Sequence, residues 1–198
     1  METIRGRQSR EMNAIELHQL IAGFENVSLD LGTGDGRFVG KSAEQNKSTF
    51  FIGVDSCREN LHAYSRNGLP NALFVIANAQ SLPHELSGLA SHVSINFPWG
   101  SLVESLLNND VCLLNGLSRV TRPCATMSLH LNADALASAG WDLNSGANQI
   151  EDVLNTSGWT TRSRTCLDAR DLRDIPTTWA KRLAFGRNPR AIRSMLQK

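Results

Sequence analysis

The chain has 198 residues, 41% of them hydrophobic, and a formal net charge of +1. This length allows a single domain whose core needs no disulfide or metal, and we find neither a membrane span nor the apolar core of a signal peptide. We therefore expect one cytoplasmic, monomeric domain over residues 1–198, and no metal site, because its four cysteines and five histidines lack metal-ligand spacing.

Predicted helices and strands alternate along most of the chain. Asn13 with Glu16 forms a capping-box pattern, and the apolar residues that follow recur at helical spacing, so a helix comes first. After it we predict strands at 27–31, 50–54, 72–76, 93–97, 125–131, 159–166 and 191–196, and helices at 37–46, 58–66, within 101–117 and around 150–154. The stretch 132–148, rich in Ala, Asn, Gly and Ser, is typical of a loop. This alternation predicts an α/β fold with a mostly parallel seven-stranded sheet flanked by helices.

A glycine-rich segment follows the first predicted strand. Asp30-Leu-Gly-Thr-Gly-Asp-Gly36 comes after an apolar run, and Asp55 ends the second such run. Glycines there bring bare backbone close to a ligand, and an acid after the second strand is placed to bind the hydroxyls of a ribose. A pyrophosphate would be repelled by Asp30 and Asp35, whereas the cationic ammonium and sulfonium of S-adenosylmethionine (SAM) suit these carboxylates. The predicted SAM-binding residues in this part are Asp30, Gly32, Thr33, Gly34 and Asp55.

Two further loops should lie at the same edge of the sheet, because ligands of such folds bind off the carboxyl ends of the strands. Residues 77–80 follow the third strand, where contacts to a bound adenine are usual, and we assign Ala79 and Gln80 to the cofactor. Residues 96–99 follow the fourth strand and face the methyl group, and Ser101 beyond them is also assigned to the cofactor. These loops contain no obvious general base. Methyl transfer from a sulfonium to an in-plane lone pair needs none, because positioning supplies most of the catalysis.

The last quarter of the chain is strongly basic. From Trp159 to Lys198 there are ten Lys and Arg against three Asp, a net charge of +7, which leaves −6 for the first 158 residues. Neutralising phosphates requires such a concentrated positive region, although charge runs are most often solvated helix faces. We interpret residues 159–198 as a region that binds nucleic acid.

Several segments resemble the aminoglycoside-resistance 16S rRNA adenine-N1 methyltransferases of the Kam/Npm type. The matching stretches run nearly from end to end, and the most specific are Phe97-Pro-Trp-Gly100 and Thr178-Trp-Ala-Lys-Arg-Leu-Ala-Phe-Gly-Arg187. The resemblance implies a Rossmann-like, class I SAM-dependent methyltransferase with S-adenosylhomocysteine as product. It also implies that the substrate is 16S rRNA within the assembled small ribosomal subunit, and that methylation gives aminoglycoside resistance.

The resemblance further implies roles for individual residues. Trp99 and Trp179 would hold the extruded target adenine between them, with Phe97 and Pro98 completing the catalytic loop; core packing is the alternative role for both tryptophans. Two stacking faces, each worth roughly 1–3 kcal/mol, are about enough to offset the few kcal/mol that extruding a base costs. The residues expected on rRNA are Lys181, Arg182, Arg187 and Arg190.

The chain departs from this family at three places, one of which is a shorter segment between the fifth and sixth predicted strands. The family has a Lys-rich loop before Gly68-Leu-Pro, whereas here only Asn67 separates Arg66 from Gly68, so we expect part of the rRNA contact to be missing. Gln80 stands where the family usually has Glu.

Two other functions stay open. Asn96-Phe-Pro-Trp99 also resembles the Asn-Pro-Pro-Tyr loop of methyltransferases that act on exocyclic or amide nitrogens, where the Asn side chain and a backbone carbonyl accept the amine hydrogens. The other possibility is a SAM-fold protein that binds the ribosome without methylating it.

Overall fold

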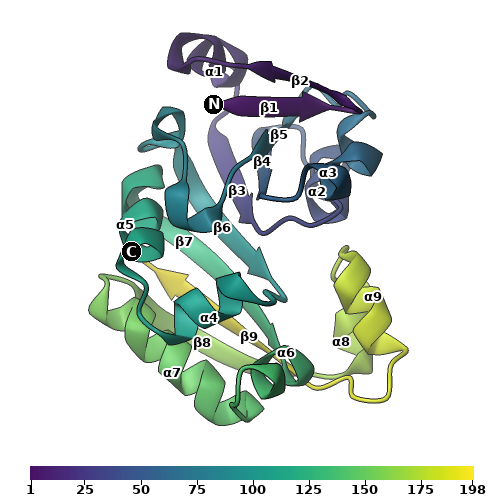
Figure 1. Cartoon of the computed structure of the whole chain (residues 1–198), viewed down its shortest axis with the longest axis vertical. Helices are drawn as coiled ribbons and strands as arrows, with labels where there is room; N and C mark the ends of the chain where they lie inside the picture. The colour runs from purple at the N-terminus through teal and green to yellow at the C-terminus, as the bar shows by residue number, and fades with distance from the viewer.

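A computed structural model describes all 198 residues and contains one nine-stranded sheet with the order β2-β1-β5-β4-β3-β6-β7-β9-β8 (Figure 1). The strands are β1 (Glu2–Arg5), β2 (Gln8–Glu11), β3 (Asn26–Leu31), β4 (Thr49–Asp55), β5 (Ala72–Ile76), β6 (Ala90–Asn96), β7 (Thr121–Asn132), β8 (Thr160–Leu167) and β9 (Ala191–Gln197). Strands β3 to β9 are the seven predicted ones. No prediction covers β1 and β2, an antiparallel hairpin that extends the sheet at the β5 edge.

The centre of the sheet is parallel, as predicted. Every pairing among β5, β4, β3, β6 and β7 is parallel. Strand β9 is antiparallel to both neighbours, so the last strand of the chain is inserted between β7 and β8. The chain runs outward from β3 to β5 and then returns to β6 on the other side of β3, and this reversal of strand order is where open α/β sheets bind ligands.

Helices cover both faces of the sheet (Figure 1). They are α1 (Ala14–Ile21), α2 (Arg37–Gln45), α3 (Arg58–Ser65), α4 (Ser101–Leu107), α5 (Val111–Val120), α6 (Ala133–Ser138), α7 (Leu143–Thr156), α8 (Ala169–Asp174) and α9 (Thr178–Ala184). The main core joins one face of the sheet to α1, α4, α5 and α7, and a smaller cluster lies on the other face under α2 and α3. A third cluster joins α8 and α9 to Phe97 at the end of β6. None of the helices is both long and apolar enough to span a membrane.

The predicted capping box at the first helix is confirmed, but the predicted helix within 101–117 is two helices. The Asn13 side chain accepts a hydrogen bond from Glu16 N, and Glu16 Oε2 accepts one from Asn13 N. Between α4 and α5, Asn109 has φ +56° and Asp110 caps α5, so the break has a local cause.

The predicted loop at 132–148 is wrong. This stretch forms α6 and the start of α7, whose first N–H groups are capped by Asp142. Its small residues are not loop formers here, because Ala133, Ala135 and Leu136 of α6 and Ala147 of α7 are buried and packing overrides weak local propensity. No prediction covers α8 and α9 either.

Candidate active site

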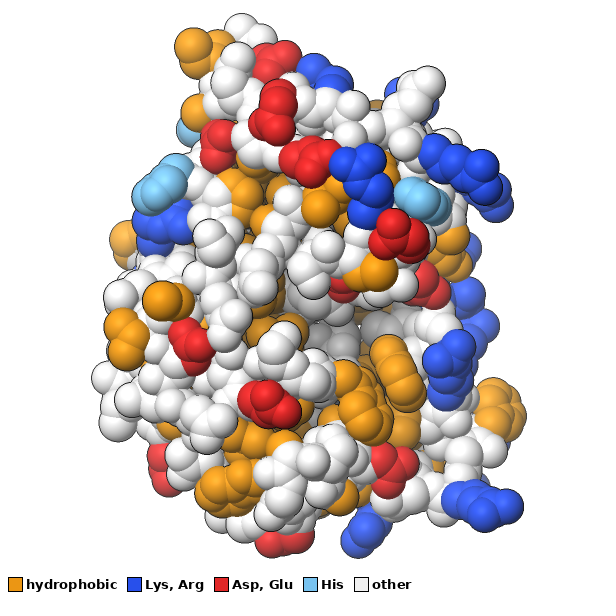
Figure 2. Space-filling view, in the orientation of Figure 1, with side chains coloured by type: hydrophobic (Ala, Val, Ile, Leu, Met, Phe, Trp, Pro, Cys, Tyr) orange, Lys and Arg blue, Asp and Glu red, His pale blue; other side chains and the backbone are white.

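A cleft of about 570 Å³ lies at the carboxyl ends of β3, β4, β5 and β6, within the range of roughly 300–1,000 Å³ typical of small-molecule sites. Figure 2 shows the hollow near the middle of the molecule. The cleft is lined by every residue that the sequence assigns to catalysis or cofactor binding: Asp30, Gly32, Thr33, Gly34, Asp55, Ala79, Gln80, Phe97, Pro98, Trp99, Ser101 and Trp179. Of the residues assigned to rRNA, only Arg182 borders it.

The glycine loop after β3 folds back onto the end of β4. The N–H groups of Gly32 and Thr33 donate to Val54 O at 2.9 and 3.0 Å. Gly32 and Gly34 have φ +72° and +57°, a backbone region that favours glycine. A β-carbon on Gly32 would stand 2.7 Å from Leu102 Cδ2, whereas one on Gly34 would meet nothing within 4 Å. Glycine is therefore favoured at position 32 by its backbone conformation and by the nearness of Leu102, and Gly34 leaves space for a ligand to approach the backbone.

Asp30 at the end of β3 is a buried carboxyl group with one unused oxygen. The residue is 2% exposed, and its Oδ1 accepts hydrogen bonds of 2.8 Å from Ser94 Oγ and Asn96 Nδ2. Its Oδ2 and the neighbouring Thr33 Oγ1 are buried and make no hydrogen bond of good geometry, although the Thr33 hydroxyl lies close enough to Asp30 to favour its charged form. Burial raises the pKa of Asp30 from 3.8 to about 6, although side-chain hydrogen bonds act in the opposite direction. A buried, unpartnered carboxyl oxygen in the wall of a cleft fits a donor or cationic group of a ligand.

Asp55 at the end of β4 is half-buried and rigidly oriented. Its Oδ2 accepts a hydrogen bond of 2.8 Å from Gly34 N, and its Oδ1 accepts one of 2.9 Å from Cys57 N. Each carboxylate oxygen can accept a further bond, so Asp55 can hold the glycine loop in place and still accept the two hydroxyls of a ribose.

Gln80 lies in a short 3-10 helix, Ala79–Ser81, that follows β5. Its Nε2 donates to Ser105 Oγ at 2.9 Å and to Asp110 Oδ2 at 2.7 Å. Hydrogen bonds from Leu113 N and then from Gln80 lower the pKa of Asp110. A Glu at position 80 would place a second carboxylate against Asp110. The amide at this position is therefore matched to Asp110.

Asn96 at the end of β6 is buried, and both polar atoms of its side-chain amide form hydrogen bonds within the protein. Its Nδ2 donates to Asp30, and its Oδ1 accepts a hydrogen bond of 2.9 Å from His130 Nδ1. Burial lowers the pKa of His130 to about 4, helped by the charge of Arg193, so this imidazole is neutral at pH 7. Asn96 thus orients Asp30, and its carbonyl oxygen already has a donor instead of waiting for a substrate amine.

Phe97 has a strained backbone conformation and a tightly packed ring, and both fix the course of the loop at residues 97–99. Its φ is +53°, a conformation that costs a non-glycine residue about 1–3 kcal/mol. Its buried ring packs with residues of α8 and α9, among them Leu172 and Leu183, and its N–H donates to His130 O at 2.8 Å. These contacts favour a positioning role for Phe97, which sets the direction of Pro98 and Trp99.

Trp99 and Trp179 stack directly on each other at the mouth of the cleft. Their ring centroids are 5.3 Å apart with an angle of 26° between the planes, and their exposed fractions are 38% and 40%. Arg182 also lies over the Trp179 ring, with its guanidinium carbon 5.3 Å from the ring centroid. Neither indole belongs to the buried core clusters. The structure therefore brings together two half-exposed aromatic faces from segments eighty residues apart.

A hydrogen bond missed by the sequence analysis connects the glycine loop to α9. Thr178 Oγ1 donates to Asp35 Oδ2 at 2.6 Å, across 143 residues of sequence. Thr178 is the first residue of α9 and directly precedes Trp179, while Asp35 lines the cleft. The sequence offered a signal only for the start of the helix, because Thr177 caps α9; nothing in it pointed to the bond with Asp35.

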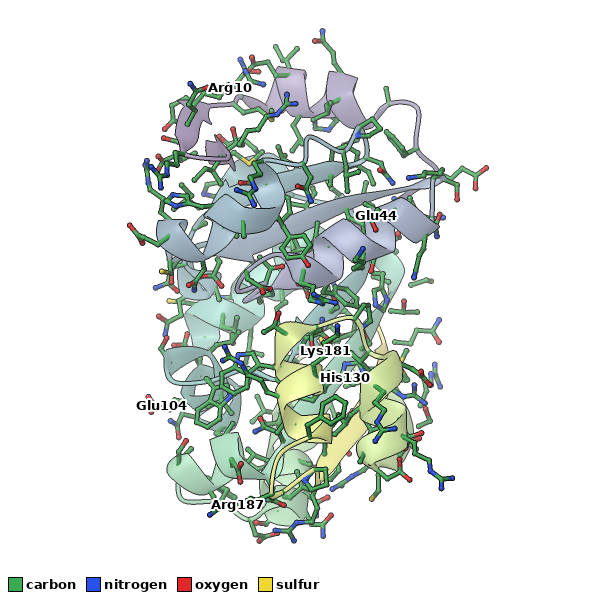
Figure 3. All side chains as sticks on the ribbon, turned by 90° about the vertical axis from the view of Figure 1, so that its right-hand side faces the viewer. Arg10, Glu44, Glu104, His130, Lys181 and Arg187 are labelled. Carbon is green, nitrogen blue, oxygen red and sulfur yellow. The ribbon has the colours of Figure 1, made fainter.

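The remaining basic residues lie outside the cleft. Figure 3 shows Lys181 on α9 and Arg187 after its end, both on the side of the molecule that carries α8 and α9. Arg190 donates from Nε to Asn188 Oδ1 at 2.9 Å. Lys181, Arg187 and Arg190 make no ion pair within the protein, so their charges are available to a partner.

Comparisons with known proteins agree with this geometry. A family model described as 16S rRNA (adenine(1408)-N(1))-methyltransferase matches residues 2–197. The curated protein of that name from Escherichia coli is 35% identical over 205 residues, covering 94% of each chain. The one from Streptoalloteichus tenebrarius is 28% identical over 204 residues, covering 95% of this chain and 94% of its own. Among solved structures, the 16S rRNA methyltransferase KamB superimposes with a TM-score of 0.89 at 27% identity, covering 100% of this chain and 99% of its own.

Proposed function

The chain belongs to the 16S rRNA (adenine(1408)-N(1))-methyltransferase family, and we propose that it transfers the methyl group of SAM to N1 of that adenine in the small ribosomal subunit. The observation that carries the proposal is the shared cleft, in which the carboxylates Asp30 and Asp55 and the stacked Trp99 and Trp179 line one cavity. A cofactor site and a site for a flat aromatic base are therefore adjacent.

The residues of the cleft fit SAM. The unpartnered Oδ2 of Asp30 and the open backbone at Gly34 are placed to receive its cationic amino-acid end. Asp55 is placed for the ribose hydroxyls, and Ala79 and Gln80 for the adenine. Thr33 and Ser101 supply further hydroxyl groups at the cleft wall. SAM supplies an activated methyl group on a sulfonium, so the protein has to orient the two reactants and exclude water.

The tryptophan pair is proposed to hold the target base. A base between two indoles requires ring planes roughly 7 Å apart, twice the stacking step of about 3.4 Å, whereas the two centroids are now 5.3 Å apart. Trp99 or Trp179 must therefore move outward when the adenine enters, and the direct stack keeps both faces dry until then. Adenine N1 carries an in-plane lone pair, so no proton has to be removed before it attacks.

The rRNA backbone is proposed to bind along α9 and the segment after it. Arg182 stands at the cleft mouth over Trp179, where it can contact the extruded nucleotide, and Lys181, Arg187 and Arg190 are free to bind phosphates. We expect the protein to act as a monomer, in the cytoplasm and on the assembled subunit.

Methylation at an exocyclic nitrogen is the less favoured alternative. In that chemistry the Asn96 carbonyl would accept an amine hydrogen, whereas here Asn96 is buried and bonded to His130 and Asp30, and the family to which the chain belongs is described as acting on N1.

The test is a primer-extension stop on 16S rRNA from cells that express the protein, followed by mass spectrometry of the modified nucleoside. We expect a stop at the target adenine and 1-methyladenosine. A 6-methyl product would favour the exocyclic alternative, and unmodified rRNA that co-purifies with the protein would favour a non-catalytic binder. The same cells should resist kanamycin and apramycin, because methylated N1 loses its lone pair and places positive charge beside cationic drugs. Parallel assays on free rRNA and on purified subunits distinguish the two substrates.

A further inference from the structure

The turn of the β1–β2 hairpin packs against the short turn between α3 and β5. Gly6 N donates to Ser65 Oγ at 2.9 Å, and a β-carbon on Gly6 would stand 3.5 Å from Arg66 Cβ. A β-carbon on Gly68 would stand 2.2 Å from Arg5 Nη2, so the Arg5 guanidinium lies directly over that glycine. The two turns form one surface, to which the hairpin contributes Arg5 and Arg7 and the second turn contributes Arg66.

We call Arg5, Arg7 and Arg66 the hairpin arginine cluster. They are the charged residues of this region that form no ion pair within the protein. The other charged residues of the hairpin all have partners: Glu2 pairs with Arg58, Arg10 with Glu16, and Glu11 with the amino group of Met1. Arg5, Arg7 and Arg66 are exposed and make neither an ion pair nor a side-chain hydrogen bond.

The cluster lies on the same side of the molecule as α8 and α9. In Figure 1 the hairpin turn is at the right-hand end of β1, above α9, and Figure 3 shows the hairpin and α9 on one face. Lys and Arg side chains follow the right-hand edge in Figure 2 from the hairpin to the region after α9. An extended polyanion that reaches α9 could therefore touch the hairpin as well.

We propose that the hairpin arginine cluster binds phosphates of 16S rRNA as a second contact, separate from the C-terminal basic region. This inference rests on the proposed function. Three unpaired guanidinium groups with five N–H donors each suit phosphate oxygens. No ion pair within the protein has to break before these groups bind a phosphate. Although the turn between α3 and β5 is short, this end of the molecule can thus still contact rRNA, because the hairpin supplies the positive charge.

The test compares the variant Arg5→Ala/Arg7→Ala/Arg66→Ala with wild type in binding to purified small subunits over a range of salt concentrations. Each lost phosphate contact lowers the slope of log affinity against log salt by about 0.7 to 0.9, so the slope should fall by about 2 to 3. Over a fourfold rise in salt, wild type should then lose roughly 20- to 40-fold more affinity than the variant. Melting temperature and SAM affinity should match those of wild type.

Arg10→Ala is the matched control, because Arg10 lies in the same hairpin but is paired with Glu16; its salt slope should not change. Methylation of the same subunits by wild type checks the proposed function independently, so failure there is distinguishable from failure of this inference. If wild type methylates the subunits and the triple variant binds with unchanged affinity and slope, the cluster does not bind rRNA. If affinity falls with no change in slope, the contact is to a ribosomal protein or is structural, and the inference is equally overturned.

Discussion

Replacing Asp30 by Asn should stabilise the cofactor-free protein while weakening SAM binding. Asp30 is buried with a pKa of about 6, against 3.8 when free in solution. The folded state therefore holds this proton more tightly than the unfolded state, so the contribution of Asp30 to stability falls as pH rises from 3.8 to about 6. Above that range the ionised carboxylate costs the fold ~3 kcal/mol as an upper limit. The amide of Asn can still accept from Ser94 and Asn96 without carrying the charge.

The affinity for SAM should rise over the pH range in which the stability of the cofactor-free protein falls. If the ionised carboxylate receives a cationic part of SAM, affinity should fall about tenfold for each pH unit below about 6, since the proton must leave first. Asp30→Asn should remove this dependence and weaken binding at pH 7.5 by about 1.5–3 kcal/mol, the value of a hydrogen bond to a charged group.

Urea unfolding of the cofactor-free protein at pH 7.5 and calorimetry with SAM from pH 5 to 8 measure the two effects. Asp152→Asn is the matched control, because Asp152 is exposed and makes no side-chain hydrogen bond or ion pair; it should change neither quantity. A SAM affinity that is flat across this pH range, or an Asp30→Asn protein that is less stable than wild type, would refute the reasoning.

Three further predictions concern the cleft. Trp99→Ala or Trp179→Ala should lower turnover, because each removes about 1–3 kcal/mol of stacking energy, and Phe at either position should restore part of it. Melting temperature and SAM affinity should stay unchanged, because both indoles are half-exposed. A joint loss of stability and activity would instead indicate core packing. Thr178→Val, which removes the bond to Asp35, should reduce kcat and change the tryptophan fluorescence response to SAM, with recovery in Thr178→Ser; full activity of the Val variant would show that the bond is dispensable. Asp55→Ala should weaken SAM binding by about 1–3 kcal/mol in calorimetry, and an unchanged affinity of the folded variant would exclude the ribose contact.

The parallel half of the fold and the cleft residues could be predicted because their signals are local. Residues 27–55 contain an apolar run, a glycine-rich turn and an acidic residue at a spacing that the sequence shows directly. The two parallel strands in this segment end at the same edge of the sheet, so the residues that follow them must lie close together. The resemblance added Trp179, since nothing in its neighbourhood alone places it beside Trp99.

Other features depend on contacts between distant segments, which periodicity does not report. The hairpin strands have too few residues to show an alternating pattern, and β2 is exposed along its length. Helix α6 consists of small residues that become helical by burial. The Asp35–Thr178 bond and the match of Gln80 to Asp110 each join residues far apart in the chain. The expectation of a lost rRNA contact at the short turn stays a prediction; it counted only the charges of that turn, and Arg5 approaches the same turn from the N-terminal hairpin.

The position of β9 bears on how the protein is made. Because this final strand lies between β7 and β8, the sheet cannot close until residues 191–197 are free of the machinery that synthesises them. Helix α9 lies in the segment between β8 and β9, so the part of the chain that carries Trp179 gains its second anchor only when β9 pairs with β7 and β8. Until β9 has paired, Trp179 is therefore not held in its place against Trp99.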